Sequence, residues 1–222
     1  MNIYLVPFVE LGFKLKFMVE HTAHLEEHRD DEASKLGMWL FIFTELLLFG
    51  GLFLVYSIFR MQYADNFHQC SLELSVTIGA INTVVLLFSS MTAAMALTAI
   101  QKSDRKGSLI YIGLTLFCAA IFLFNKYIEW GAKFHHGLYP GSDLMHLLDK
   151  GHHLYFSLYF FMTGLHALHI IIGMTLLIVC FFKVKSKNIN SEDYVLLENG
   201  ALYWHLVDLI WIFVFPLLYL IS

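Results

Sequence analysis

This chain has 222 residues, of which 58% are hydrophobic and only 14% charged, and its formal net charge is −4 with histidine neutral. Soluble globular domains carry about a quarter charged residues, so the composition excludes that class and favours one polytopic membrane domain. The acidic balance provides no basic surface for a nucleic-acid partner. The three cysteines (Cys70, Cys118 and Cys180) are far apart and form no CxxC pair, which argues against a disulfide framework or a thiolate metal site.

Residues 1–34 form an N-terminal segment that we expect to be interfacial or cytoplasmic. Ile3 to Val19 is apolar but is interrupted by one glutamate and two lysines, which makes it a poor membrane span. Its apolar positions can share one face of a helix that lies in the membrane interface. The stretch lacks the basic start and the small-residue cleavage site that are typical of a signal peptide.

The first predicted span lies between Lys35 and Arg60, which enclose 24 almost wholly apolar residues. About 20 helical residues cross the hydrocarbon core, so this segment is long enough to span. Glu45 lies ten residues in from Lys35, close to the expected bilayer midplane. A carboxylate there costs about 2.5–3.5 kcal/mol on insertion scales, so we expect Glu45 to be neutral, paired or turned into a helix bundle. This position suits both a structural glutamate that packs against a neighbouring helix and one that handles protons or lipid.

Four further apolar segments follow, separated by short polar connections. They are Leu72–Ile100, Leu109–Trp130, Leu154–Phe182 and Ala201–Ile221. Each is long enough to cross a membrane as a helix. We therefore predict an all-α, polytopic bundle of five transmembrane helices over residues 35–222.

The distribution of lysine and arginine predicts the orientation of this bundle. The N-terminal tail, the 101–107 loop and the 183–198 loop together carry ten of these cations, whereas the two alternate loops carry three. Cytoplasmic loops are enriched in lysine and arginine. The count therefore predicts a cytoplasmic N-terminus and a C-terminus on the outer side.

Seven polar or aromatic residues within the later spans are expected to fix helix packing or to contact lipid. They are Lys126, Glu129, His166, His169, Trp204, His205 and Asp208. Lys126 and Glu129 are three residues apart, so they can form a local ion pair near the outer end of the third span. His205 and Asp208 have the same spacing, and we expect them to be buried polar partners.

The twelve histidines raise the question of a metal site. A b-type haem needs histidines from two helices at matching depth, and the polar groups of the fourth and fifth predicted spans fall at depths about 9 Å apart. This argues against haem ligation. The pairs His135–His136 and His152–His153 fall in an outer loop, where exposed histidines are the ordinary expectation and zinc is the alternative. Because no catalytic or cofactor fingerprint is found, we expect no independent active site.

Five segments, taken in order, resemble subunit III of the haem-copper respiratory oxidases, and the match extends over about residues 36–221. They are LGMWLFIFTELLLFGGLF, INTVVLLFSS, KYIEWGAKFHHGLYPG, FFMTGLHALHIIIGMTLLIVCF and GALYWHLVDLIWIFVFPLLYL. The first resembles the family's helix with a buried glutamate, and the last is the most specific. Two departures stand out. The chain lacks the first two helices of the seven-helix members, as the shorter bacterial members do, and Lys126 stands where several relatives carry an acid.

The resemblance implies a non-catalytic core subunit of a proton-pumping terminal oxidase in the bacterial inner membrane. Such a subunit would bind no haem or copper itself. It would pack against subunits I and II, where the haem and copper are expected, with phospholipid in clefts between its helices. Glu45 matches the family's buried carboxylate, which reacts with a hydrophobic carbodiimide and helps to keep proton uptake by the catalytic subunit fast and lasting.

Other assignments are open at this point. Subunit III of a quinol oxidase would share these segments, and the electron donor, cytochrome c or quinol, binds to other subunits. An accessory protein of nitric-oxide reductases also shares these helices. A small proton-coupled transporter could use Glu45 and Asp208, but the chain has neither paired broken helices nor inverted halves.

Overall fold

The computed structural model describes residues 31–142, 145 and 147–220, and the elements among them are all helical. The chain divides into two units, residues 1–34 and residues 35–222. Apart from Asp31 to Ser34, which begin the first described helix, the N-terminal segment and its expected interfacial helix lie outside the described residues. Among the described residues, five helices are long and apolar enough to cross a membrane, which confirms the predicted five-span, all-α class. The orientation of the N-terminus stays a prediction.

The described elements follow one another as six α-helices and a short π-helix. They are α2 (Asp31–Gln62), α3 (Ala64–Leu72), α4 (Val76–Gln101), α5 (Arg105–His135), α7 (Lys150–Lys185), α8 (Val195–Phe215) and η1 (Pro216–Leu220). Three of the spanning helices, α5, α7 and α8, begin four to six residues before the boundaries predicted from hydropathy. These helices continue through polar residues beyond the apolar segments, and at the start of α5 a side-chain cap sets the end of the helix.

The two ends of α5 show how such caps work. The side chain of Asp104 accepts a hydrogen bond of 2.9 Å from the backbone N–H of Gly107 at the start of the helix. At the other end, Gly137 has a φ of +69°, and the N–H of Leu138 donates to the carbonyl of Lys133 at 3.0 Å. A glycine in this left-handed conformation closes the helix by a Schellman motif.

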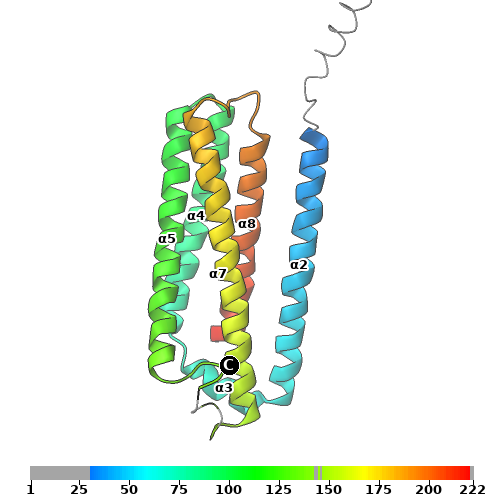
Figure 1. Ribbon diagram of the computed structural model, residues 1–222, viewed down its shortest axis with the longest axis vertical. Coiled ribbons are helices and arrows are strands. Elements are labelled where there is room, and N and C mark those ends of the chain that lie inside the picture. The colour runs from blue at the N-terminus through cyan, green and yellow to red at the C-terminus, as the bar shows by residue number, and fades with distance from the viewer. Residues whose placement is uncertain (1–30, 143–144, 146, 221–222) are drawn as a thin grey trace, which may run out of the picture. The chain divides into compact units, whose positions relative to one another are not determined.

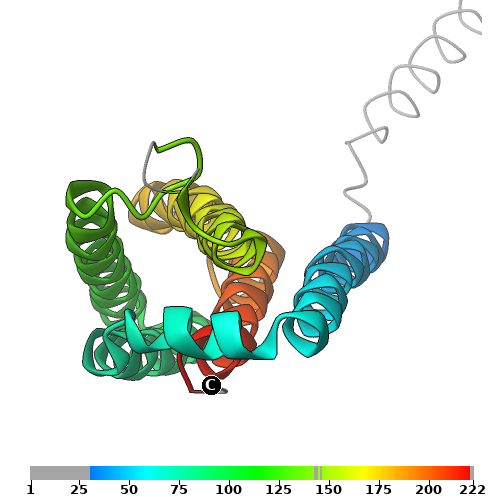
Figure 2. The ribbon, with the colours of Figure 1, turned by 90° about the horizontal axis from the view of Figure 1, so that it is seen from below.

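Helices α4, α5, α7 and α8 form a four-helix bundle in which each helix packs against two of the others (Figures 1 and 2). Large aromatic side chains such as Phe122, Trp204 and Trp211 are fully buried between them. Helix α3 crosses one end of this bundle, which we call the α3 end. The opposite end carries the α4–α5 and α7–α8 connections. There, the guanidinium of Arg105 donates to the carbonyls of Val184 and Lys185 at the end of α7.

Helix α2 lies beside α8 and outside the ring of four helices (Figure 2). Only three of its side chains are buried, Ile42, Phe49 and Tyr56, and they recur every seven residues along one face. A seven-residue repeat forms a single narrow seam on a helix. The other apolar side chains of α2 are largely exposed in this chain. In a membrane that surface must be covered by lipid or by other protein.

Candidate functional site

The first polar site joins α2 to α7. The Nε2 atom of His169 lies 2.9 Å from a carboxyl oxygen of Glu45, and its Nδ1 atom lies 2.7 Å from the carbonyl oxygen of Leu165. A carbonyl can only accept, so Nδ1 carries a hydrogen. The bond between Nε2 and Glu45 then contains one proton, which resides either on the carboxyl or on the imidazole. In both forms the pair is neutral overall and holds one exchangeable proton.

The surroundings of this pair fix the imidazole of His169. The edge of Phe49 lies against it at a ring-centroid distance of 5.3 Å, and the hydroxyl of Tyr203 donates to its backbone carbonyl at 3.2 Å. The side chains of Glu45 and His169 are 14% and 8% exposed. The pair therefore lies at the rim of the bundle beneath α2. The sequence predicted that Glu45 would be neutral, paired or turned into the bundle, but not that His169, 124 residues away, would be its partner.

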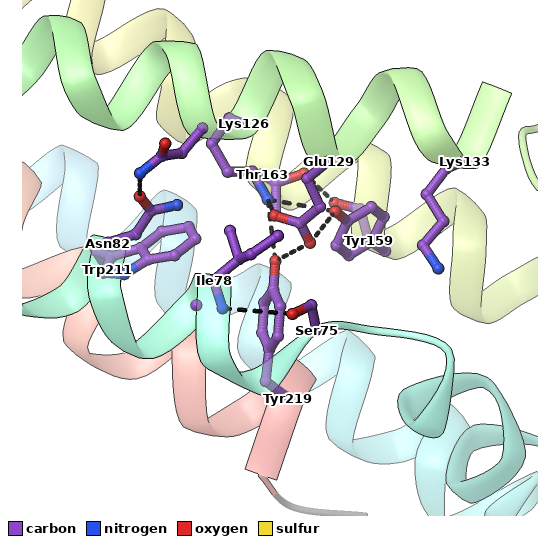
Figure 3. Close-up of polar contacts among 12 residues, drawn as sticks. Ser75, Ile78, Asn82, Lys126, Glu129, Lys133, Tyr159, Thr163, Trp211 and Tyr219 are labelled. Carbon is purple, nitrogen blue, oxygen red and sulfur yellow. Dashed lines mark hydrogen bonds and ion pairs between the residues drawn. The ribbon is translucent and has the colours of Figure 1, made fainter. Parts of the chain in front are cut away.

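The second polar site lies inside the bundle and is built on the ion pair of Lys126 and Glu129 (Figure 3). The ammonium of Lys126 donates to Glu129 at 2.9 Å, to the hydroxyl of Tyr159 at 3.2 Å and to the hydroxyl of Tyr219 at 3.0 Å. Both tyrosine hydroxyls donate to the other oxygen of Glu129, at 2.8 and 2.5 Å. This ring of bonds uses all three N–H groups of the lysine and both oxygens of the glutamate.

The expected ion pair is thus confirmed, but its setting differs from the interface that was predicted. The side chains of Lys126 and Glu129 are only 3% and 4% exposed. The ammonium also lies 5.1 to 5.7 Å from the ring centroids of Tyr159, Trp211 and Tyr219. The tyrosines that enclose the pair come from α7 and from the π-helix η1. Their contribution could not be seen from the spacing of the pair itself.

The third group of polar residues lies along α8. Its Trp204 donates to the hydroxyl of Ser89 at 3.1 Å, and Nδ1 of His205 lies 2.7 Å from the hydroxyl of Ser90. The expected pairing of His205 with Asp208 is wrong, because His205 turns to a hydroxyl on α4 instead. The Asp208 carboxylate has no hydrogen-bond partner among the described residues. His166, on α7, is fully buried, and neither of its ring nitrogens has a hydrogen-bond partner among the described residues.

The expected depths of the polar groups in the last two spans also need correction. Helix α8 begins at Val195, so Asp208 lies 13 residues from that end, whereas His169 lies 16 residues from the end of α7 at Lys185. At 1.5 Å per residue the two depths differ by about 4.5 Å rather than 9 Å. Depth therefore gives no argument against haem ligation.

The histidines of the predicted outer loop lie near the α3 end. Among the described residues, no three His, Cys, Asp or Glu side chains are grouped so that they could hold a metal ion. His136 and His152 line a cavity of about 380 Å³ together with Cys70 and Glu73. Burial is the main reason that the pKa of the Cys70 thiol is raised to about 12, so this thiol is protonated and a poor ligand or nucleophile.

Comparison with known proteins places this helical framework in a family. The family model described as "Cytochrome c oxidase subunit III" matches residues 14–222. A "Cytochrome c oxidase subunit 3" from Thermostichus vulcanus is 29% identical over 204 residues, covering 90% of this chain and 92% of the relative. A "Probable quinol oxidase subunit 3" from Staphylococcus saprophyticus is also 29% identical, over 92% of this chain and 98% of the relative.

A third relative is longer than this chain. The "Heme-copper oxidase subunit I+III" of Aeropyrum pernix is 32% identical over 192 residues, which cover 83% of this chain and 22% of that protein. The matches extend over nearly the whole chain, including all five spanning helices. The chain therefore belongs to the cytochrome c oxidase subunit III family of the haem-copper oxidases.

Proposed function

We propose that this chain is the non-catalytic subunit III of a proton-pumping terminal oxidase, in which the Glu45–His169 pair helps to sustain proton uptake by the catalytic subunit. The observation that carries the proposal is the 2.9 Å distance between Nε2 of His169 and the Glu45 carboxyl, a hydrogen bond that requires one shared proton. Glu45 lies near the middle of α2, and the pair is mostly shielded yet lies at the rim of the bundle. A carboxyl–imidazole pair that holds its proton without a net buried charge suits a place beside a proton path.

The partners follow from the family. The relative from Aeropyrum pernix is named as subunits I and III together, which supports direct packing of this chain against a subunit I. The exposed apolar faces of α2 offer a surface for subunit I or for phospholipid. Subunit II would complete the complex, and haem and copper would reside in the partner subunits. The bacterial inner membrane is the corresponding location.

The electron donor is decided by those partners. Relatives named for cytochrome c oxidase and for quinol oxidase match this chain at the same identity. Purification of the complex through a tag on this chain, followed by assays with reduced cytochrome c, quinol and nitric oxide, assigns the donor and the gas that is reduced. Reduction of nitric oxide alone would instead favour the accessory protein of a nitric-oxide reductase.

The role of Glu45 is tested by the substitution Glu45→Gln in the purified complex, reconstituted in vesicles. The amide N–H of the glutamine can still donate to Nε2 of His169, so the contact between α2 and α7 persists while the exchangeable proton is lost. We expect normal initial turnover, followed by faster inactivation or fewer protons pumped per electron during sustained activity.

Glu198→Gln provides the matched control. Glu198 forms an ion pair of 2.9 Å with Lys35 and is another polar link between α2 and the bundle, at the opposite end from α3. This variant weakens a link of α2 without altering the proton near the middle of the helix. Equal inactivation rates and pumping ratios for Glu45→Gln and the parent would contradict the proposal and leave Glu45 as a packing residue. Equal effects of both variants on inactivation and pumping would also contradict the proposal, because they would show that weaker attachment of α2 to the bundle is the cause.

A further inference from the structure

Several polar side chains in the core of the four-helix bundle have unmet hydrogen-bonding capacity among the described residues, and His166, Asp208 and Asn82 are among them. Both nitrogens of His166, both carboxyl oxygens of Asp208 and the amide nitrogen of Asn82 have no partner. These residues are 0%, 3% and 0% exposed, respectively. They come from three helices, α7, α8 and α4. The missing hydrogen-bond partners are therefore a property of the bundle interior rather than of one strained helix.

The hydroxyl groups nearest Asp208 have other hydrogen-bond partners. Asp208 lies beside Ser89 and Ser90 of α4. The hydroxyl of Ser89 donates to the carbonyl of Leu86 at 2.8 Å and accepts from Trp204 at 3.1 Å. The hydroxyl of Ser90 is bonded to His205. The one proton of Ser89 is therefore already used, and the one proton of Ser90 is used as well where its hydroxyl donates to Nδ1 of His205.

His166 is enclosed by aromatic rings that supply no hydrogen-bond acceptor in their planes. The Phe122 ring and the imidazole form a T-shaped pair at 5.4 Å between centroids, and the Trp211 ring lies at 5.1 Å. The indole N–H of Trp211 is directed elsewhere, to the hydroxyl of Thr83 at 3.1 Å. An imidazole always has at least one N–H to donate, so at least one donor of His166 is left unmet.

Asp208 and His166 lie about one helical turn apart in the interior of the bundle. Trp211, which contacts His166, is three residues after Asp208 on α8. Phe122, which also contacts His166, is four residues after Cys118 on α5, and Cys118 lies close enough to Asp208 to interact with it electrostatically. Residues three or four apart lie one turn apart on a helix face. His166 is thus about one turn from Asp208, between α5, α7 and α8.

We propose that bound water occupies this interior, where it bridges the Asp208 carboxyl and the His166 imidazole. More than nine in ten buried polar groups in native proteins are paired with protein or with ordered water, and a buried water makes about three hydrogen bonds. The two oxygens of Asp208 and a nitrogen of His166 provide that number. The charged or titratable groups that interact electrostatically with the site are Lys126 and His169 around His166, and Cys118 beside Asp208. His205, bonded to Ser90, lies one turn before Asp208 on α8.

This site is separate from the Glu45–His169 pair and does not depend on the function proposed for that pair. A bridging water makes Asp208 and His166 an exchangeable acid–imidazole couple within the bundle. Without water, Asp208 would have to remain a neutral acid turned to a serine oxygen, and His166 would be a dry, unpaired ring. The two arrangements differ in whether water is present beside Trp211 and Cys118.

Radiolytic hydroxyl labelling of the intact complex distinguishes the arrangements, because radicals formed from a bound water modify only side chains next to it. The readout is the modification of Trp211 and Cys118, measured by mass spectrometry. Tyr155 serves as the internal control, since it is 0% exposed and its hydroxyl is satisfied by the carbonyl of Leu218 at 2.9 Å. We expect Trp211 and Cys118 to be labelled several-fold faster than Tyr155.

The variant His166→Phe tests the bridge itself, because it keeps an aromatic ring and removes both nitrogens. We expect it to lower the labelling of Trp211 several-fold. Labelling of Trp211 and Cys118 no faster than that of Tyr155 in the parent complex would overturn the proposal. This comparison needs no variant, so it decides the question even where His166→Phe does not assemble. Unchanged labelling of Trp211 in an assembled His166→Phe complex would also overturn the bridge.

Discussion

At the scale of single residues, Lys126 shows how a full charge is accommodated in an apolar helix bundle. Each of its three N–H groups has an oxygen acceptor, and the opposing charge of Glu129 is 2.9 Å away. Two tyrosine hydroxyls complete the coordination of Glu129. Removing one member of a buried ion pair is costly because the other is left charged and unpaired, whereas removing both charges is often tolerated.

This asymmetry gives a prediction for the ion pair. Lys126→Met should lower the stability of the subunit by about 3–5 kcal/mol, because it leaves Glu129 unpaired. The double variant Lys126→Met with Glu129→Gln should be more stable than the single variant, since the neutral amide oxygen can still accept from both tyrosines. The order of stability of the parent, the single variant and the double variant is measured by thermal dissociation of this subunit from the purified complex. A double variant that is no more stable than Lys126→Met would show that the charges themselves are required.

The residues that the sequence identified correctly are those whose partners are close in the chain. Lys126 and Glu129 are one turn apart, so helix geometry alone predicted their pairing. Glu45 and His169 lie on different helices, and their contact depends on the rotation and depth of both. His205 and Asp208 also share a face, but serines of α4 offered His205 another partner. Local spacing therefore predicts which side chains can meet, and packing decides which do.

At the scale of elements, the contact between α7 and α8 depends on the absence of a side chain. A Cβ added to Gly173 would lie 2.9 Å from the ring of Trp204 and 3.1 Å from that of Tyr203. The Trp204 ring cannot readily move, because it is fully buried and its N–H is held by Ser89. The glycine therefore sets the distance between the two helices.

Gly173→Ala should consequently weaken the bundle, with Gly113→Ala as the control. A Cβ at Gly113 would meet nothing within 4 Å. Both substitutions favour the helix by about 1 kcal/mol, so their difference isolates the clash, for which we expect a cost of about 1–3 kcal/mol. The measurement is the dissociation temperature and the yield of each assembled complex. Equal values for the two variants would mean that α7 and α8 separate at little cost.

Sequence periodicity and hydropathy predicted the number and order of the spanning helices but not their ends or the short α3. Hydropathy detects residues in the hydrocarbon region, whereas the bounds of α5 are set by the N-cap residue Asp104 before it and by Gly137 after it. The predicted second span began at Leu72, which belongs to α3. Nine residues of mixed polarity give no membrane signal, and α3 is held by the buried side chains of Phe67 and Cys70.

At the scale of the whole molecule, charge in the connections and the number of crossings both bear on orientation. Five described helices are able to span, and an odd number of crossings places the beginning of α2 and the end of η1 on opposite sides of a membrane. Ten lysines and arginines flank one side of the predicted topology and three flank the other. In the structure, Arg105 at the start of α5 donates hydrogen bonds to the last carbonyls of α7. At least one of these cations therefore also links the α4–α5 connection to the end of α7.

These arguments predict that the C-terminus faces the periplasm. Alkaline phosphatase, which folds only outside the cytoplasm, should be active when it is fused after Ser222. The same enzyme fused after Ser103, in the connection between α4 and α5, should be inactive, because two crossings return the chain to the cytoplasmic side. A fluorescent protein that matures in the cytoplasm should give the opposite pattern at both positions. An inactive phosphatase at Ser222 with an active one at Ser103 would mean either that the bundle is inverted, so that the cation-rich connections lie outside, or that α2 does not cross. Inactivity at both positions would require an even number of crossings between Ser103 and Ser222, so one of α5, α7 and α8 would lie outside the membrane. Because α2 is the helix least embedded in the bundle, a fluorescent protein fused before Met1 separates the first two cases: fluorescence there together with an inactive phosphatase at Ser222 shows that α2 does not cross, and its absence shows that the bundle is inverted.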